Sequence, residues 1–335
     1  MPSFNLAELT LWRGSFTAWS PPRNETVSLS EPDHDDIWPH VSHDAVMSRA
    51  TDIQPTPPEG THTEADGVSY HRIEMGTGSP AIFLHGGGPG CTAWSDFGPV
   101  APLFGRDRRC HLIDILQYGR SEKCLITGPM WDFHAAKTVA LMDTLDIERA
   151  DFICNSWGGA IALNLAAKYP DRVRSLVVTG SMPVFYGPLA PLPERGHRGR
   201  IARDIYYGGN GPSWEKMREL MARLEWYDAD AIPDATVTMR YEQSLDVDEM
   251  SLAAASDNPR GDWQDLTAAL GQITCPVLFA WGMQDAFLTP DYPLMLARMV
   301  PRGHLYVMDH AAHHLQEERP HDFYSIVTGF LNQQQ

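Results

Sequence analysis

One serine stands in a setting that could make it a nucleophile. Residues 151–160 read DFICNSWGGA, an apolar run that leads through Ser156 into a helix-favouring stretch. A serine in a tight strand-to-helix turn needs small residues two positions before and after it, and the turn holds its hydroxyl beside the helix N-terminus. Gly158 fits this pattern, and Cys154 takes the earlier place, where glycine is usual. We predict that Ser156 is the catalytic nucleophile; a helix-capping serine and a nucleophilic Cys154, expected to be buried, are the alternatives.

A nucleophilic serine needs a base, and the base needs an acid that orients it. Asp285 follows one apolar run near the C-terminus, and the next apolar run is followed by DHAAHHLQEE. The pattern of two small residues, a histidine and a glutamate five residues later favours His313 as base over His314 and His310. Asp285 is the predicted orienting acid, with a plain turn residue as its alternative. No second ligand group matches the histidines in spacing, so no metal site is expected.

A glycine-rich loop supplies the remaining part of such a site. Residues 85–90 read HGGGPG directly after the apolar run at 81–84. Backbone N–H groups from this loop and from the residue after the nucleophile can stabilise an oxyanion, and we assign these donors to Gly87 and Trp157. The loop has neither GxGxxG nor GK[ST], so a phosphate-binding role is not favoured. His85 is expected to support the loop rather than to react.

The surrounding pattern predicts the elements that would position these residues. Short apolar runs alternate with helical stretches, which indicates a mostly parallel sheet with helices on both faces. The expected strands are 81–84, 110–114, 151–154, 175–179, 276–280 and 304–308, and the expected helices are 132–145, 157–168, 213–227 and one from about Pro320. The alternation stops between about Pro183 and Asp265, where no strand is expected. We predict a core of residues 65–182 and 265–335, with 183–264 inserted as a helical cap.

Composition limits the partners of the protein. The formal charge of −17 opposes binding to nucleic acid or to an anionic membrane surface, and no apolar run is long enough to span a bilayer. Five cysteines in no metal-binding pattern, and no visible signal peptide, favour the cytoplasm. Residues 1–64 are rich in Pro, Ser, Asp and His, and we expect an N-terminal extension that is either poorly ordered or packed through its tryptophans.

Together these stretches resemble the meta-cleavage product hydrolases, a carbon–carbon bond hydrolase branch of the α/β-hydrolase fold. The resemblance extends over about residues 66–333. It rests on the loop at 85–90 with AWSDF after it, on NSWGG at 155–159, on MRYE at 239–242, and on the stretches around Asp285 and His313. Three features depart from the family pattern: Cys154 in place of glycine, His314 where tryptophan is usual, and Leu116-Gln117 where Pro-Gly is common.

The resemblance implies an activity and further site residues. Its substrates are 2-hydroxy-6-oxo-hexa-2,4-dienoates, cleaved between C5 and C6 without metal or organic cofactor. Arg240 would pair with the substrate carboxylate, Asn155 would help to hold the same end, and Gly88 and His314 are also expected at the substrate. The resemblance also makes a homo-oligomer plausible. The alternative activities are an esterase, a lactonase or a proline iminopeptidase-like enzyme, for which Glu225 or Asp228 could bind the substrate amine, and a non-catalytic binding protein.

Overall fold

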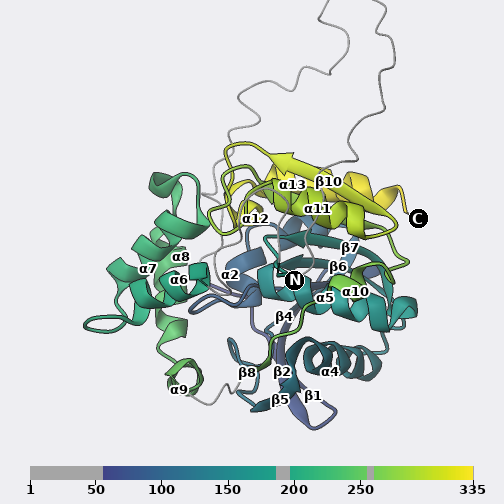
Figure 1. Ribbon diagram of the computed structural model, residues 1–335. Helices are drawn as coiled ribbons and strands as arrows, with labels where there is room; N and C mark the ends of the chain where they lie inside the picture. The colour runs from purple at the N-terminus through teal and green to yellow at the C-terminus, as the bar shows by residue number, and fades with distance from the viewer. Residues whose placement is uncertain (1–55, 186–196, 255–259, 335) are drawn as a thin grey trace, which may run out of the picture. The chain divides into compact units, whose positions relative to one another are not determined.

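The computed structural model describes residues 56–185, 197–254 and 260–334 (Figure 1). Most of the expected N-terminal extension, with its tryptophans, lies outside the described residues. The predicted start of the core at residue 65 falls within a strand, because residues 61–65 already pair with the following strand. Within the described part of the chain, no helix has the length and apolar character that crossing a membrane would require.

An eight-stranded sheet forms the centre of the fold, in the order β1-β2-β4-β3-β6-β7-β9-β10. Pairing is parallel from β4 to β10 and antiparallel at β1–β2 and β2–β4. The strands are β1 (Thr61–Ala65), β2 (Val68–Met75), β3 (Ser79–Leu84), β4 (Arg108–Ile113), β6 (Ala150–Asn155), β7 (Val173–Thr179), β9 (Val277–Gly282) and β10 (Gly303–Met308). The predicted parallel sheet is confirmed, and each of its six expected strands lies within three residues of the observed one. The sequence analysis did not expect β1 and β2.

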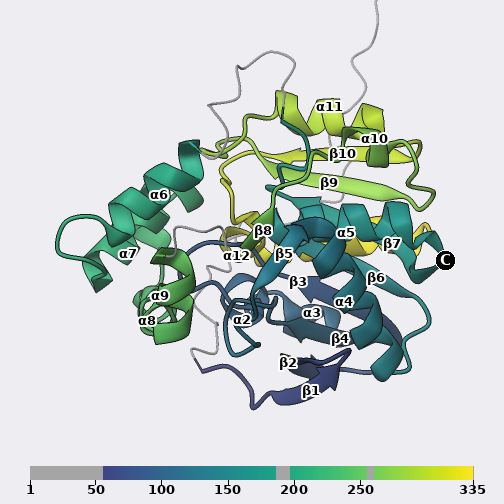
Figure 2. The same cartoon turned by 60° about the horizontal axis from the view of Figure 1, so that its bottom comes forward.

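Helices cover both faces of this sheet (Figures 1 and 2). Ile82 and Phe83 are consecutive in β3 and belong to two different apolar clusters, because successive side chains of a strand point to opposite faces. The cluster of Ile82 includes side chains from α4 (Met130–Thr144), α5 (Ser156–Lys168), α10 (Thr267–Leu270) and α11 (Asp291–Met299). The cluster of Phe83 includes side chains from α2 (Ala93–Phe97), α3 (Ala101–Phe104), α12 (Leu315–Glu318) and α13 (Pro320–Asn332). A 3₁₀ turn, Pro170–Arg172, precedes β7.

The segment between β7 and β9 holds a group of helices that gathers at one side of the sheet (Figure 2). Its elements are α6 (His197–Tyr207), α7 (Trp214–Leu220), a π-helical turn (Met221–Glu225), a 3₁₀ turn (Ala229–Ala231), α8 (Asp234–Ser244), α9 (Val247–Ala254) and β8 (Arg260–Asp262). These helices share an apolar cluster of their own around Tyr206 and Met217. The expectation of no strand here is wrong at β8, which pairs with β5 (Ile126–Pro129). Three residues are too few to show a strand pattern in the sequence.

Candidate active site

Ser156 lies in a strained turn between β6 and α5. Its φ is +47°, a left-handed conformation that non-glycine residues rarely adopt outside functional turns. The turn is tight: a Cβ on Gly158 would lie 2.2 Å from the carbonyl oxygen of Leu84, so only glycine fits there. Cys154 is fully buried two residues earlier, and burial raises the pKa of its thiol. The thiol is therefore protonated and closed to substrate, whereas Ser156 lines a cavity.

Of the three candidate histidines, His313 is the one that pairs with Asp285. Its Nδ1 lies 3.0 Å from Oδ2 of Asp285, and both residues are buried. Oδ1 of Asp285 accepts the backbone N–H groups of Phe287 and Leu288, at 2.8 Å and 3.1 Å, which fixes the carboxylate. The two residues meet because they follow the neighbouring parallel strands β9 and β10, whose carboxyl ends share one edge of the sheet.

The other two histidines are engaged elsewhere. His310 is exposed and lies beside Asp309. His314 is buried, and its Nδ1 contacts Oε1 of Glu317. Ser156 and His313 line the same cavity, and Asp285 is bonded to His313; that these three residues act as a catalytic triad stays a prediction.

The glycine-rich loop packs directly against the nucleophile turn. A Cβ on Gly87 would lie 2.7 Å from the indole of Trp157 and 3.0 Å from the Tyr118 hydroxyl, so this close approach requires glycine. His85 supports the loop, because its Nδ1 contacts the Gly86 carbonyl at 2.7 Å and its Nε2 accepts the backbone N–H of Ile115 at 2.9 Å. Gly87 therefore lies against the side chain of Trp157; that the backbone N–H groups of these two residues form an oxyanion hole stays a prediction.

A cavity of about 820 Å³ opens above these residues. Its lining includes seven of the predicted site residues: Gly87, Gly88, Asn155, Ser156, Trp157, His313 and His314. Asp285 stands behind His313, outside the lining. One wall is aromatic, since Trp131, Trp157 and Trp263 contact one another with ring centroids 5.2 to 6.1 Å apart. Such a wall suits a planar, conjugated substrate.

Asn155 is held by the scaffold on one side. Its Nδ2 donates to the Thr179 hydroxyl at 2.8 Å and to the carbonyl of His313 at 3.2 Å. It therefore ties the nucleophile strand to the histidine loop. Its Oδ1 is buried and accepts no hydrogen bond from the described residues.

Arg240, on α8, does not line the cavity. It is fully buried, and its guanidinium forms a two-point ion pair with Glu225, in which Nη2 lies 3.2 Å from Oε1. Its Nε and Nη2 also donate to the carbonyl of Pro89, at 3.3 Å and 3.0 Å. Burial alone would raise the pKa of Glu225, but Arg240 and His314 outweigh it and hold the pKa below the ordinary value. Glu225 is thus an ionised carboxylate, and it lines the cavity next to His314.

His314 carries a positive charge in this environment. Burial acts to lower its pKa, but Glu225 and Glu317 raise it to about 9. Its backbone N–H donates to the carbonyl of Glu225 at 3.1 Å. Asp228, the other acid considered for an amine, does not line the cavity; its side chain accepts the backbone N–H of Asp230.

Among the lining residues that the sequence analysis missed are Tyr118, Glu249 and Arg260. Tyr118 follows β4 at the sheet edge that carries Ser156, and this position could have indicated it. Glu249 and Arg260 lie in the inserted segment, where nothing in the sequence separates them from surface charges.

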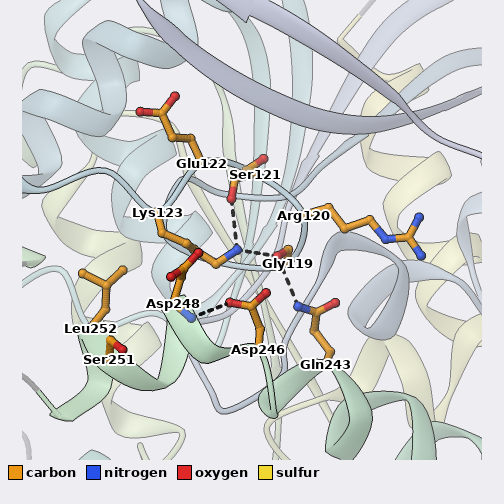
Figure 3. A pocket seen from close by; sticks show the side chains of 10 residues that line it. All are labelled: Gly119, Arg120, Ser121, Glu122, Lys123, Gln243, Asp246, Asp248, Ser251 and Leu252. Carbon is orange, nitrogen blue, oxygen red and sulfur yellow. Dashed lines mark hydrogen bonds between the residues drawn. The ribbon is translucent and has the colours of Figure 1, made fainter.

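A second hollow lies outside this site (Figure 3). It is lined by residues 119–123 and by polar residues of α8, α9 and the turn between them, and it contains none of the predicted site residues. Lys123 spans it, donating to the carbonyls of Gly119 and Ser121.

Comparison with known proteins agrees with this geometry. Residues 80–320 match the sequence model of the alpha/beta hydrolase fold family. The chain is 33% identical to the 2-hydroxymuconate semialdehyde hydrolase of Pseudomonas sp. (strain CF600) over 286 residues, which are 83% of this chain and 95% of the relative. It is 30% identical to the 2-hydroxy-6-oxo-6-phenylhexa-2,4-dienoate hydrolase of Comamonas testosteroni, over 78% and 91% of the two chains.

Solved structures show the same fold. The meta-cleavage product hydrolase of Pseudomonas fluorescens IP01 superimposes with a TM-score of 0.70 at 23% identity, over 82% of this chain and 98% of the other. From the family match and the curated relatives together, the chain belongs to the α/β-hydrolase fold family, in its branch of meta-cleavage product hydrolases.

Proposed function

We propose that this protein hydrolyses the C5–C6 bond of a 2-hydroxy-6-oxo-hexa-2,4-dienoate, a ring-fission product of aromatic catabolism. The observation that carries the proposal is the joining of Ser156, His313 and Asp285 at one sheet edge, in a chain 33% identical to a 2-hydroxymuconate semialdehyde hydrolase. The aromatic wall of the cavity suits the conjugated chain of such a substrate. The five cysteines are all free thiols, which supports placing the enzyme in the cytoplasm.

The first stage is ketonisation. The proton of the 2-hydroxyl leaves and a proton arrives at C5, giving a 2,6-diketone with a C3–C4 double bond. C5 then lies between two groups that can accept its electron pair. The oxygen on C6 is placed toward the backbone N–H groups of Gly87 and Trp157.

The second stage breaks the bond. With His313 as base, Ser156 attacks C6 or activates a water that does so, and the C6 oxygen becomes an oxyanion. When this intermediate collapses, the C5–C6 electron pair is delocalised through C3–C4 onto the C2 oxygen, which takes up a proton. One water is consumed, and the products are a 2-hydroxydienoate and a carboxylic acid. Asp285 keeps His313 in the required tautomer and stabilises its protonated form.

The role of Arg240 at the substrate carboxylate stays a prediction. Its guanidinium is bound to Glu225 and Pro89, so it would have to exchange Glu225 for substrate.

The test is to mix the protein with a yellow ring-fission product and to follow the loss of its visible absorbance, with Ser156→Ala as the control. We expect the wild type to bleach the substrate and the variant to be inactive. If the colour persists while p-nitrophenyl esters or prolyl amides are hydrolysed quickly, the proposal is wrong and an esterase or peptidase reading replaces it. A binding protein would turn over none of these and would not react with a fluorophosphonate at Ser156.

A further inference from the structure

An acidic substrate needs a cation whose charge is not already neutralised. The polar end of the cavity near α8 does not offer one. Arg240 and His314 are its cations, and Glu225, Glu317 and Asp96 are packed around them. Because Glu225 pairs with Arg240, is ionised and itself lines the cavity, a carboxylate placed here would meet a like charge.

Arg260 lies in a different part of the same cavity. It begins β8, and its guanidinium lies over the ring of Tyr118, at 4.7 Å from the centroid, and over that of Trp157, at 5.5 Å. Its Nη1 donates to the Tyr118 hydroxyl, which in turn donates to the carbonyl of Gly87 at 3.2 Å. Arg260 is thus fixed beside the nucleophile turn and the glycine-rich loop.

Part of this guanidinium has no hydrogen-bond partner among the described residues. Nε of Arg260 is buried, and no described residue accepts a hydrogen bond from it. Within the described ranges, no carboxylate lies within ion-pair distance of Arg260. Glu249 also lines the cavity. Its burial raises its pKa to about 7, although the positive charges of Lys123 and Arg260 act to lower it. At neutral pH its negative charge is therefore incomplete.

We propose that Arg260 is the carboxylate-binding residue of the cavity. Two aromatic rings hold the guanidinium plane in place at the cavity, and a guanidinium fixed in this way can bind a carboxylate at two points. The proposal rests on the proposed function for the identity of the substrate. The carboxylate is either that of the dienoate, which every substrate of this class carries, or a second one on the C6 substituent.

The kinetic test compares Arg260→Gln and Arg260→Lys with the wild type. The substrates are 2-hydroxy-6-oxohepta-2,4-dienoate, 2-hydroxy-6-oxonona-2,4-dienedioate and the neutral ester p-nitrophenyl acetate. The matched control is Arg120→Gln, which removes the same charge from an exposed position beside the hollow of Figure 3. We expect Arg260→Gln to lower kcat/KM for an acidic substrate by about 10- to 100-fold, the usual effect of a hydrogen bond to a charged group, and to lower kcat/KM for the ester clearly less. Arg260→Lys keeps the charge but not the two-point geometry, so it should recover only part of this loss.

The pattern of losses identifies the carboxylate. Equal losses on the two acidic substrates assign Arg260 to the dienoate carboxylate, and a loss confined to the dienedioate assigns it to the second one. Unchanged kcat/KM on both substrates overturns the proposal, and so does an equal loss on the ester, because Arg260 would then act only by supporting Tyr118 and the loop.

A binding measurement separates this proposal from the proposed function. Hexa-2,4-dienoate and hexa-2,4-dienedioate are titrated against each variant, and the fluorescence of the cavity tryptophans is followed. We expect Arg260→Gln to weaken binding at least about 10-fold while Arg120→Gln binds as the wild type does. If the wild type does not bleach the ring-fission product but binding of the acids still depends on Arg260, the proposed function is wrong and the assignment of Arg260 as a carboxylate-binding residue is supported. If Arg260→Gln binds both acids as tightly as the wild type, the assignment of Arg260 is wrong.

Discussion

Gly180 is placed so that a single methyl group there would displace His313, the predicted catalytic base. It directly follows β7, with a φ of +55°. A Cβ built on it would lie 2.5 Å from Cε1 and 2.7 Å from Nδ1 of His313. We predict that Gly180→Ala disables the enzyme through His313 while leaving the rest of the site in place.

The size of the effect follows from these distances. Carbon atoms in contact are separated by about 3.5–4.0 Å, so the imidazole must shift by about 1 Å. The same shift breaks or stretches the 3.0 Å contact between Nδ1 of His313 and Asp285. A misplacement of about 1 Å in a catalytic group can cost about 100-fold in rate. The left-handed backbone adds roughly 1–2 kcal/mol of destabilisation, because the new side chain opposes this conformation.

A second glycine isolates the backbone cost. Gly128, in β5, has a φ of +79° and no atom within 4 Å of a built Cβ. Gly128→Ala therefore carries a similar backbone cost and no contact with His313. The measurements are kcat for a ring-fission product and for p-nitrophenyl acetate, with the melting temperature as the stability control. We expect both variants to melt lower and only Gly180→Ala to lose about 100-fold in kcat on both substrates. Equal kcat values for the two variants at equal stability would refute the reasoning.

Three further predictions concern buried charges. Asp285→Asn should lower kcat by about 10⁴-fold on either substrate, because the amide favours the wrong tautomer of His313; a kcat within 10-fold of the wild type would argue against Asp285 as the orienting acid. Glu225→Gln leaves Arg240 buried without its partner and should lower the free energy of unfolding in urea by about 3–5 kcal/mol. The double variant Glu225→Gln with Arg240→Met should lose less stability than this. If the two substitutions instead lower the free energy of unfolding additively, the two side chains do not stabilise each other. Burial raises the pKa of Glu249 from 4.5 to about 7, so between these pH values the folded protein holds a proton that the unfolded chain releases. The free energy of unfolding should therefore fall as pH rises from about 4.5 to about 7. Glu249→Gln should not show this fall, and parallel pH profiles of the variant and the wild type would exclude Glu249 as its source.

Much of the fold could be predicted because its central strands are buried on both faces. β6 is buried at all six positions, and such runs remain visible in a sequence as continuous apolar stretches. β1 and β2 lie at the antiparallel edge, and β1, with the sequence THTEA, is mostly exposed. Strands of this kind mix polar and apolar residues, so the sequence analysis left most of β1 in the extension and did not recognise β2 as a strand of the core. β5 and β8 were missed because they are only four and three residues long.

The site residues also differ in how far the sequence could identify them, because some are placed by local patterns and others by contacts between distant parts of the chain. Ser156 and His313 were identifiable because the turn and the strand end that place them are local in sequence. The choice of Arg240 came from a four-residue resemblance, which indicates where an arginine lies but not which acid it meets. Its partner Glu225 lies 15 residues earlier, at the end of the π-helical turn. The contact of Arg260 with Tyr118 joins residues 142 positions apart, and no sequence pattern records it.

The charge of the whole chain and the charge of the cavity have to be kept apart. A formal charge of −17 opposes an anionic substrate at long range, but salt screens exposed charges over about 8 Å at physiological ionic strength. Within the cavity, screening by solvent is weak, so the charges nearest to the substrate determine whether an anion is attracted or repelled. Glu225 forms an ion pair with Arg240, and Glu317 forms one with His314. These two cations therefore fix the geometry of the site more than they attract an anion. Arg260 has aromatic rings where Arg240 and His314 have acids, so its charge remains available to a substrate carboxylate, as proposed above.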